Sequence, residues 1–291
     1  MAFPFNLNQL SKGPVFYDIR EDLPGFETIA DVDKESMIRQ TALFKRGLVN
    51  RVYNDLAEKL FEGGGDDYHC MSPACPRCVR VNRQGFYHAA MTLSNQYNVI
   101  NQRTFTLVYY SEAMTTGQLI AFNPARLQQR LRQQLIRCGF KHPVIGGLEL
   151  DYNEDIQRWV PHFHLLAVND VEAIEKLRGY FTKEKRSMSS VDPSAQYISR
   201  PMLVQRLKNP SKQISYLCKQ RWQSIHVYRD KDGKRRTSKR RLDERRFPQS
   251  LRLLDQFSFS DLLFLYKARV ISNEIIGASC QREKGGNHVK E

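Results

Sequence analysis

The sequence lacks any apolar run that approaches the ~20 residues needed to span a bilayer. Its first residues, Met1-Ala2-Phe3-Pro4-Phe5, lack the charged segment and apolar core of a secretory signal. The absence of both features argues against a membrane protein and against a secreted protein. We therefore expect a cytoplasmic protein that has no membrane partner.

The chain also lacks a nucleotide-binding loop. Gly63-Gly64-Gly65 has neither the lysine nor the flanking strand that a Gly-x-x-x-x-Gly-Lys-[Ser/Thr] loop requires. No internal repeat is visible. If the protein acts on DNA, ATP-driven strand separation is expected to come from a partner, such as a host helicase.

Cysteine is scarce and unevenly placed. The chain has six cysteines, and three of them, Cys70, Cys75 and Cys78, fall within nine residues. This distribution suits a reducing compartment with one metal site better than a disulfide framework. A structural Zn²⁺ site needs four ligands, and we predict His88 as the fourth, with His69 as the alternative. A redox-active Cys75-x-x-Cys78 pair is a second interpretation, although the proline-rich surroundings do not match its usual strand-to-helix setting.

Acidic residues are too few to balance the basic ones. Lys and Arg total 45 against 31 Asp and Glu, which gives a formal net charge of +14. Such an excess favours a polyanionic partner, and DNA is the first expectation. The charge is densest after the turn signal Asp232-Gly233, where residues 234–241 could return as the second strand of a hairpin. The predicted DNA-contacting residues of this hairpin are Lys234, Arg235, Arg236, Lys239, Arg240 and Arg241; a basic loop without order is the alternative.

Hydrophobic periodicity predicts an α+β protein. Helical spacing is seen over residues 33–61 with an interruption at Gly47, over 124–138, over 171–181, over 213–220 and from Ser258 or Ser260 through 275. Apolar, β-branched runs predict strands at 103–110, 144–151, 158–168 and 224–229. We divide the chain into a helical and zinc-binding region (1–98), a catalytic unit (99–228), and a region with the basic hairpin, a helix and a disordered tail (229–291).

Two histidines on one predicted strand are the strongest chemical signal. His162 and His164 are two positions apart, so their side chains project from one face of the strand. Glu149 lies in the preceding apolar strand, where an unpaired carboxylate would be costly. A hairpin between the two strands would bring the three side chains together. Two imidazoles and one carboxylate then form a divalent-metal site with open positions.

A tyrosine and a lysine follow downstream. Tyr216 and Lys219 are three residues apart and would share one face of a helix. A tyrosine in such an apolar segment often serves packing alone. A cation one turn away can instead stabilise a phenolate or bind a phosphate, which makes Tyr216 a candidate nucleophile.

The ordered set of Glu149, Pro161-His162-Phe163-His164-Leu165-Leu166 and Tyr216-Leu217-Cys218-Lys219 resembles the HUH endonuclease superfamily. Its order is similar to that of the single-tyrosine initiators (Rep proteins) of rolling-circle replication. The resemblance covers about residues 100–225, and Thr104-Phe105-Thr106-Leu107 looks like the first motif of these initiators. The cysteine cluster ahead of it is similar to that of some plasmid Rep proteins and related transposases.

The resemblance implies a central antiparallel sheet of ferredoxin-like type flanked by helices. It also implies Mg²⁺ or Mn²⁺ at Glu149, His162 and His164, and attack of Tyr216 on a single-stranded DNA phosphate with help from Lys219. A 5′-phosphotyrosine and a free 3′-hydroxyl would result, as replication initiation requires. A single-tyrosine transposase and a non-catalytic, zinc-containing DNA-binding regulator are the alternatives.

Overall fold

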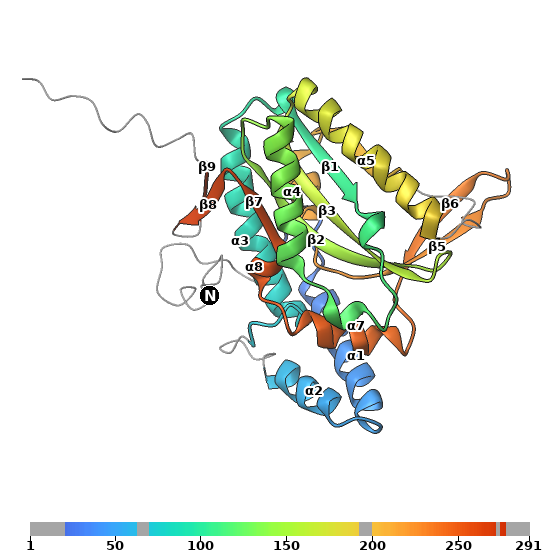
Figure 1. The fold of residues 1–291 in the computed structure, drawn as a ribbon. Helices are drawn as coiled ribbons and strands as arrows, with labels where there is room; N and C mark the ends of the chain where they lie inside the picture. The colour runs from blue at the N-terminus through green and yellow to red at the C-terminus, as the bar shows by residue number, and fades with distance from the viewer. Residues whose placement is uncertain (1–20, 63–69, 192–199, 272–273, 278–291) are drawn as a thin grey trace, which may run out of the picture.

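A computed structural model of the chain describes residues 21–62, 70–191, 200–271 and 274–277 (Figure 1). Its helices are α1 (Ile29–Gly47), α2 (Val52–Glu62), α3 (Pro76–Asn95), α4 (Pro124–Cys138), α5 (Val171–Val191), α6 (Pro210–Tyr216), α7 (Arg246–Leu254) and α8 (Phe259–Leu262). Its strands are β1 (Gln102–Val108), β2 (Val144–Asn153), β3 (Arg158–Val168), β4 (Met202–Arg206), β5 (Ser224–Arg229), β6 (Arg235–Arg240), β7 (Leu263–Tyr266), β8 (Ala268–Ile271) and β9 (Glu274–Gly277). The expected α+β class is confirmed.

One large sheet organises the molecule. Its strand order is β4-β1-β3-β2-β5-β6, and β7 pairs with the first residues of β2, on the edge whose far end pairs with β5. The predicted β2–β3 hairpin is present and runs in register from Val144↔Ala167 to Asn153↔Arg158. The sheet was expected to be antiparallel, but β2 and β5 are parallel at Tyr152↔Ser224, so the sheet is mixed.

Alternation along the strands separates the two faces of the sheet. Phe163 and Leu165 of β3 pack with Leu148 of β2 in one apolar cluster, together with residues of α4 and α5. These two helices lie across that face in Figure 1. The stripe Leu127, Leu131 and Leu135 buries α4, because residues four apart lie on one side of a helix.

The opposite face is covered by α3 and α6. Phe86 and Leu93 of α3 pack with Leu166 of β3 and Ile214 of α6. The side chains that alternate with Phe163 and Leu165 therefore point toward this second layer. His162 and His164 belong to this face.

Local signals set most of the helix ends. Asn123 caps α4 by accepting a hydrogen bond from the backbone N–H of Arg126, and Gly139 ends it with a φ of 84°. The predicted interruption at Gly47 is confirmed, since α1 ends there and α2 starts at Val52. The first helix begins before the predicted residue 33, because Thr28 caps α1 through a capping box with Asp31.

The prediction of a final helix through residue 275 was wrong. The short α8 ends at Leu262, and the apolar residues that follow form β7, β8 and β9. The sheet also extends past the boundary drawn at residue 228, because β6 and β7 belong to it. The predicted disordered tail, 281–291, lies outside the described residues.

No helix within the described ranges has both the length and the hydropathy that a membrane span requires.

Candidate metal centre and nucleophile

The β2–β3 register brings the three predicted metal ligands together. Glu149 is the direct cross-strand partner of His162, and His164 lies two residues further along β3. Nε2 of His162 is 3.7 Å from Oε2 of Glu149, and Nε2 of His164 is 3.8 Å from the same oxygen. The three ligand atoms lie within 4.8 Å of one another, so a single ion could contact all three.

The far side of each imidazole is also held. Nδ1 of His162 lies 3.4 Å from the carbonyl oxygen of Val160. Nδ1 of His164 lies 3.1 Å from Oγ of Thr106 on β1. Such outer contacts fix the ring orientation and direct the Nε2 lone pair toward a metal.

Burial and charge leave these groups in the forms that bind a cation. Burial raises the pKa of Glu149, but the neighbouring imidazoles of His162 and His164 outweigh it and lower the pKa to about 2. Burial lowers the pKa of His164 to about 3, so this imidazole is neutral near pH 7. Oε1 of Glu149 and Nε2 of His164 are buried without a hydrogen-bond partner. Polar atoms without partners are costly in an apolar interior, and a metal ion would satisfy both.

The predicted nucleophile lies against this centre. The ring of Tyr216 packs edge-on to the imidazole of His164, with 4.9 Å between the centroids. Tyr216 is 39% exposed, so its side chain also faces solvent. Nζ of Lys219 lies 5.6 Å from the Tyr216 ring centroid. Burial lowers the pKa of Lys219.

The helix that carries Tyr216 differs in its ends from the expected one. Asn209 caps α6, and the helix ends at Tyr216, so Lys219 follows the helix instead of sharing its face. The segment after the helix lies directly on β2. A Cβ at Gly147 would lie 2.6 Å from the carbonyl oxygen of Leu217, so only glycine permits this approach.

Two further residues of the centre were not predicted. Asp151 lies two positions after Glu149 on β2 and is 1% exposed. Its Oδ2 lies 3.8 Å from Nε2 of His162 and accepts a 2.8 Å hydrogen bond from Nζ of Lys239 on β6. The alternation that identified the histidine pair would also have identified Asp151, since residues 149 and 151 share a face. No local sequence signal distinguishes Lys239 from the other hairpin cations.

The basic hairpin is present as β5 and β6, but much of its charge is already paired. Four of the six residues predicted to contact DNA form ion pairs: Arg236 with Asp230, Lys239 with Asp151, Arg240 with Glu154 and Arg241 with Glu35. Lys234 is exposed near the turn, and the side chain of Arg235 lies outside the described part of the structure. The density of charge in the sequence therefore overstates the charge that the hairpin offers to a polyanion.

A cavity of about 350 Å³ lies beside the segment that follows Tyr216. Lys219 and Arg221 line it, together with arginines from α1, α3 and the end of the hairpin. Two of its carboxylates, Glu27 and Glu35, are engaged with Arg83 and with Arg241. The cavity is therefore predominantly cationic and continuous with the lysine next to the tyrosine.

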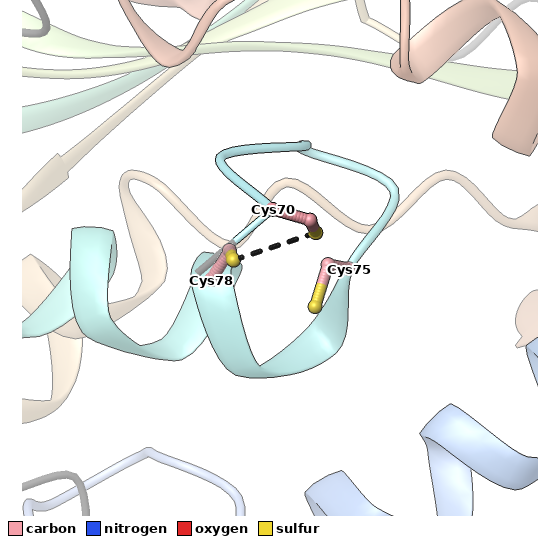
Figure 2. Close-up of side chains that lie close together, drawn as sticks. All are labelled: Cys70, Cys75 and Cys78. Carbon is pink, nitrogen blue, oxygen red and sulfur yellow. Dashed lines mark hydrogen bonds between the residues drawn. The ribbon is translucent and has the colours of Figure 1, made fainter. Parts of the chain in front are cut away.

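The cysteine cluster lies at the start of α3 (Figure 2). Cys75 caps the helix, Cys78 lies in its first turn, and Cys70 reaches the same point from the preceding loop. The sulfur atoms of Cys70 and Cys78 are 3.7 Å apart, close to the roughly 3.8 Å separation of thiolates that share a tetrahedral Zn²⁺ with ~2.3 Å bonds. Hydrogen bonds from the Cys70 and Cys78 thiols hold the pKa of Cys75 below its usual value.

The predicted fourth ligand, His88, does not join this cluster. It lies ten residues after Cys78 on α3, which is roughly 15 Å along a helix. Its Nε2 lies 3.4 Å from a carboxylate oxygen of Glu21 instead. The alternative ligand, His69, lies outside the described residues. Among those described, only the three cysteines form the group.

Comparisons with known proteins gave no match to a family model, to a curated protein or to a solved structure.

Proposed function

We propose that this protein is a metal-dependent enzyme that nicks and rejoins single-stranded DNA, with Tyr216 as the nucleophile, and that it initiates rolling-circle replication. The observation that carries the proposal is the contact between Tyr216 and His164, which places a partly exposed phenol beside three convergent metal ligands. A structural tyrosine would not need such neighbours. The resemblance to single-tyrosine HUH initiators points to the same chemistry.

The residues of the site would have separate roles. Glu149, His162 and His164 would hold Mg²⁺ or Mn²⁺, since Mn²⁺ accepts both imidazole and carboxylate ligands. The bound ion would act as a Lewis acid on a phosphate oxygen. Lys219, beside the tyrosine ring, would bind the same phosphodiester or the next one along the strand.

The covalent step is balanced without another reactant. The Tyr216 oxygen forms a bond to phosphorus, and the bond from phosphorus to the 3′ oxygen breaks. The phenol loses one proton and the departing 3′ oxygen gains one, which leaves a 5′-phosphotyrosine and a free 3′-hydroxyl. Since one phosphodiester replaces another, attack by a 3′-hydroxyl can reverse the step without ATP.

The cationic surroundings suit a single strand. The cavity lined by Lys219 and Arg221 would follow the phosphates next to the scissile one. The same parts would serve a single-tyrosine transposase. A non-catalytic DNA-binding regulator would need neither the metal ligands nor the tyrosine contact.

For the cysteine cluster we propose a structural Zn²⁺. The buried sulfur atoms of Cys70, Cys75 and Cys78 have a spacing that suits tetrahedral thiolate ligation. The cluster lies at the start of α3, and the far end of this helix packs against the sheet. The ion would fix the loop before α3 to that helix.

A nicking assay tests the enzymatic proposal. The protein is incubated with Mn²⁺ and a labelled pool of random-sequence single strands, and protein–DNA adducts are separated on denaturing gels. Wild type and Tyr228→Phe, a matched change at an exposed hairpin tyrosine, are expected to form adducts. Tyr216→Phe is expected to form none while still binding the pool. Equal adduct yields in the two variants would show that another residue is the nucleophile.

A further inference from the structure

The β5–β6 hairpin contributes one lysine to the metal and tyrosine centre. Lys239 pairs with Ile225 across the hairpin, and β5 in turn lies beside the end of β2. This arrangement brings Nζ of Lys239 to 2.8 Å from Oδ2 of Asp151. The hairpin is also tied to the residue that follows β2, because Arg240 and His226 both contact the carboxylate of Glu154. Lys239 is therefore held in place by several contacts of its strand.

The carboxylate that holds Lys239 is itself fixed. Asp151 is buried, and its Oδ1 accepts a 2.9 Å hydrogen bond from the backbone N–H of Gln223. Its Oδ2 binds Lys239 and faces the imidazole of His162. Both oxygens are thus engaged, and the carboxylate has little freedom to turn.

The charge of Lys239 also acts on the Tyr216 side chain. Oδ2 of Asp151, which holds this ammonium, lies 3.8 Å from Nε2 of His162, and the neighbouring His164 packs against the Tyr216 ring. Burial lowers the pKa of Lys239, but Asp151 and Glu149 outweigh it and raise the pKa, so the group is a cation near pH 7. Lys219 differs in position, since its Nζ lies over the tyrosine ring.

We propose that Lys239 is a second catalytic cation of this site, which contacts the Tyr216 hydroxyl and the phosphate under attack, and that Asp151 is its positioning residue. The inference rests on the proposed nicking function and changes the role of the hairpin. Negative charge develops on the phosphate oxygens during attack, and a cation already held beside the nucleophile stabilises that charge without reorganising. In this account the hairpin serves catalysis through Lys239, in addition to any contact with the DNA backbone.

Lys231 offers the matched control. It belongs to the same hairpin and carries the same charge, but it lies in the exposed turn between β5 and β6. A cation that only contacts the DNA backbone should affect binding and its salt dependence. A cation that acts on the reacting phosphate should affect the rate of the covalent step at saturating DNA.

The experiment compares Lys239→Met, Lys239→Arg, Asp151→Asn and Lys231→Met in single-turnover adduct formation with saturating single-stranded DNA and Mn²⁺. The affinity for the same DNA is measured by fluorescence anisotropy at several salt concentrations. We expect Lys239→Met to lower the rate by roughly 100-fold and the affinity by less than about 3-fold, and Lys239→Arg to restore part of the rate. Asp151→Asn should lower the rate by a smaller factor, and Lys231→Met should leave it unchanged.

Two results would overturn the inference. Lys239→Met could form the adduct at the wild-type rate, or its whole defect could lie in affinity and disappear at saturating DNA; either result makes Lys239 a backbone contact at most. Circular dichroism and Mn²⁺ binding identify a variant that has not folded. If Lys239→Met has not folded, Lys239→Arg decides the question. An adduct rate of Lys239→Arg no higher than that of an uncharged variant contradicts a role for the charge. If wild type itself forms no adduct, the proposed function fails and the role of Lys239 fails with it.

Discussion

Glu149 and His164 are buried polar groups that face each other without satisfying all of their hydrogen-bonding atoms. The carboxylate stays ionised and the imidazole stays neutral because of their surroundings. Burying such groups costs free energy that an apolar pair would not cost. This cost is consistent with a site kept for a ligand rather than for stability.

The buried imidazole predicts how metal-free protein responds to acid. His164 has a pKa of about 3 in the folded chain against ~6.5 for an ordinary histidine in the unfolded chain. The unfolded chain therefore binds the proton first, so stability from this group is complete above about pH 6.5 and falls as the pH decreases toward 3. Between pH 7 and pH 5 wild type should lose roughly 2 kcal/mol more than His164→Gln. Urea unfolding at both pH values measures this, and equal losses in the two proteins would contradict the cause assigned here.

Sequence patterns identified the three residues of the candidate metal site better than the groups around them. Glu149, His162 and His164 were found because strand alternation fixes which side chains share a face. Asp151 obeys the same rule but was overlooked because an acidic residue near a turn is common. Lys239 could not be singled out, since only the pairing of β5 with β2 selects it from a run of cations.

At the level of elements, the contact between the tyrosine segment and β2 depends on one glycine. The segment after α6 crosses Gly147, which is on the same face of β2 as Glu149. On this face, β2 thus carries the Glu149 carboxylate and, two residues earlier, a glycine without a side chain. The absence of a Cβ at Gly147 allows the segment that follows Tyr216 to lie close to the candidate metal ligands.

A side chain at position 147 should impair nicking without impairing metal binding. Gly147→Ala would force a Cβ to within 2.6 Å of the Leu217 carbonyl oxygen, so the tyrosine segment must move. We expect adduct formation to fall by at least about 10-fold, because small displacements of reacting groups cost large factors in rate. Mn²⁺ binding, followed by electron paramagnetic resonance, should stay within about 2-fold of wild type.

Gly179→Ala is the control for this prediction. A Cβ there meets nothing within 4 Å on α5, and alanine favours a helix over glycine by roughly 1 kcal/mol. This variant should retain full activity and be at least as stable as wild type. Unchanged adduct formation by Gly147→Ala would mean that the segment is not positioned by this approach.

The elements were predicted well where one periodicity was long and capped. The α4 helix has a strict four-residue stripe between Asn123 and Gly139, and β2 and β3 are long apolar runs joined by a polar turn. The C-terminal apolar residues were misassigned because short apolar runs fit a helix and a strand equally well. The segment of β7 forms a strand because it pairs with the edge of β2 at Val144–Gly147. No local sequence feature indicates that this edge is available for pairing.

For the whole molecule, the cysteine cluster ties the N-terminal helices to the layer that covers the site. The α3 helix begins at Cys75 and Cys78 and continues to Phe86 and Leu93, which pack against the sheet. Loss of a metal at its first turn would loosen that layer. Loss of the metal should therefore lower the stability of the protein more than its rate of adduct formation.

Metal analysis tests this part of the account. Wild type should carry about one Zn²⁺ per chain, and Cys75→Ser should lose it, with a Tm lower by roughly 5–10 °C. Cys138→Ser changes a buried cysteine of α4 outside the cluster and should retain the ion. Equal zinc contents in the two variants would exclude the cluster as the zinc site.

The net charge of +14 predicts a polyanionic partner, and this stays a prediction. Where the charge acts is a property of the folded chain. Arg236, Arg240 and Arg241 are committed to carboxylates, whereas Lys219 and Arg221 line a cavity by the tyrosine. The composition gives the total charge, whereas the fold of the sheet determines which cations face the candidate site.

The central claim is that Tyr216 is the nucleophile at the Glu149, His162 and His164 centre. The most direct measurement is mass spectrometry of the nuclease- and protease-treated adduct formed with Mn²⁺ and the single-strand pool. The account predicts a nucleotide phosphate linked to the peptide that contains Tyr216, and its loss when His162 and His164 are both replaced by Ala. A nucleotide on any other residue, or no adduct from wild type, would contradict it.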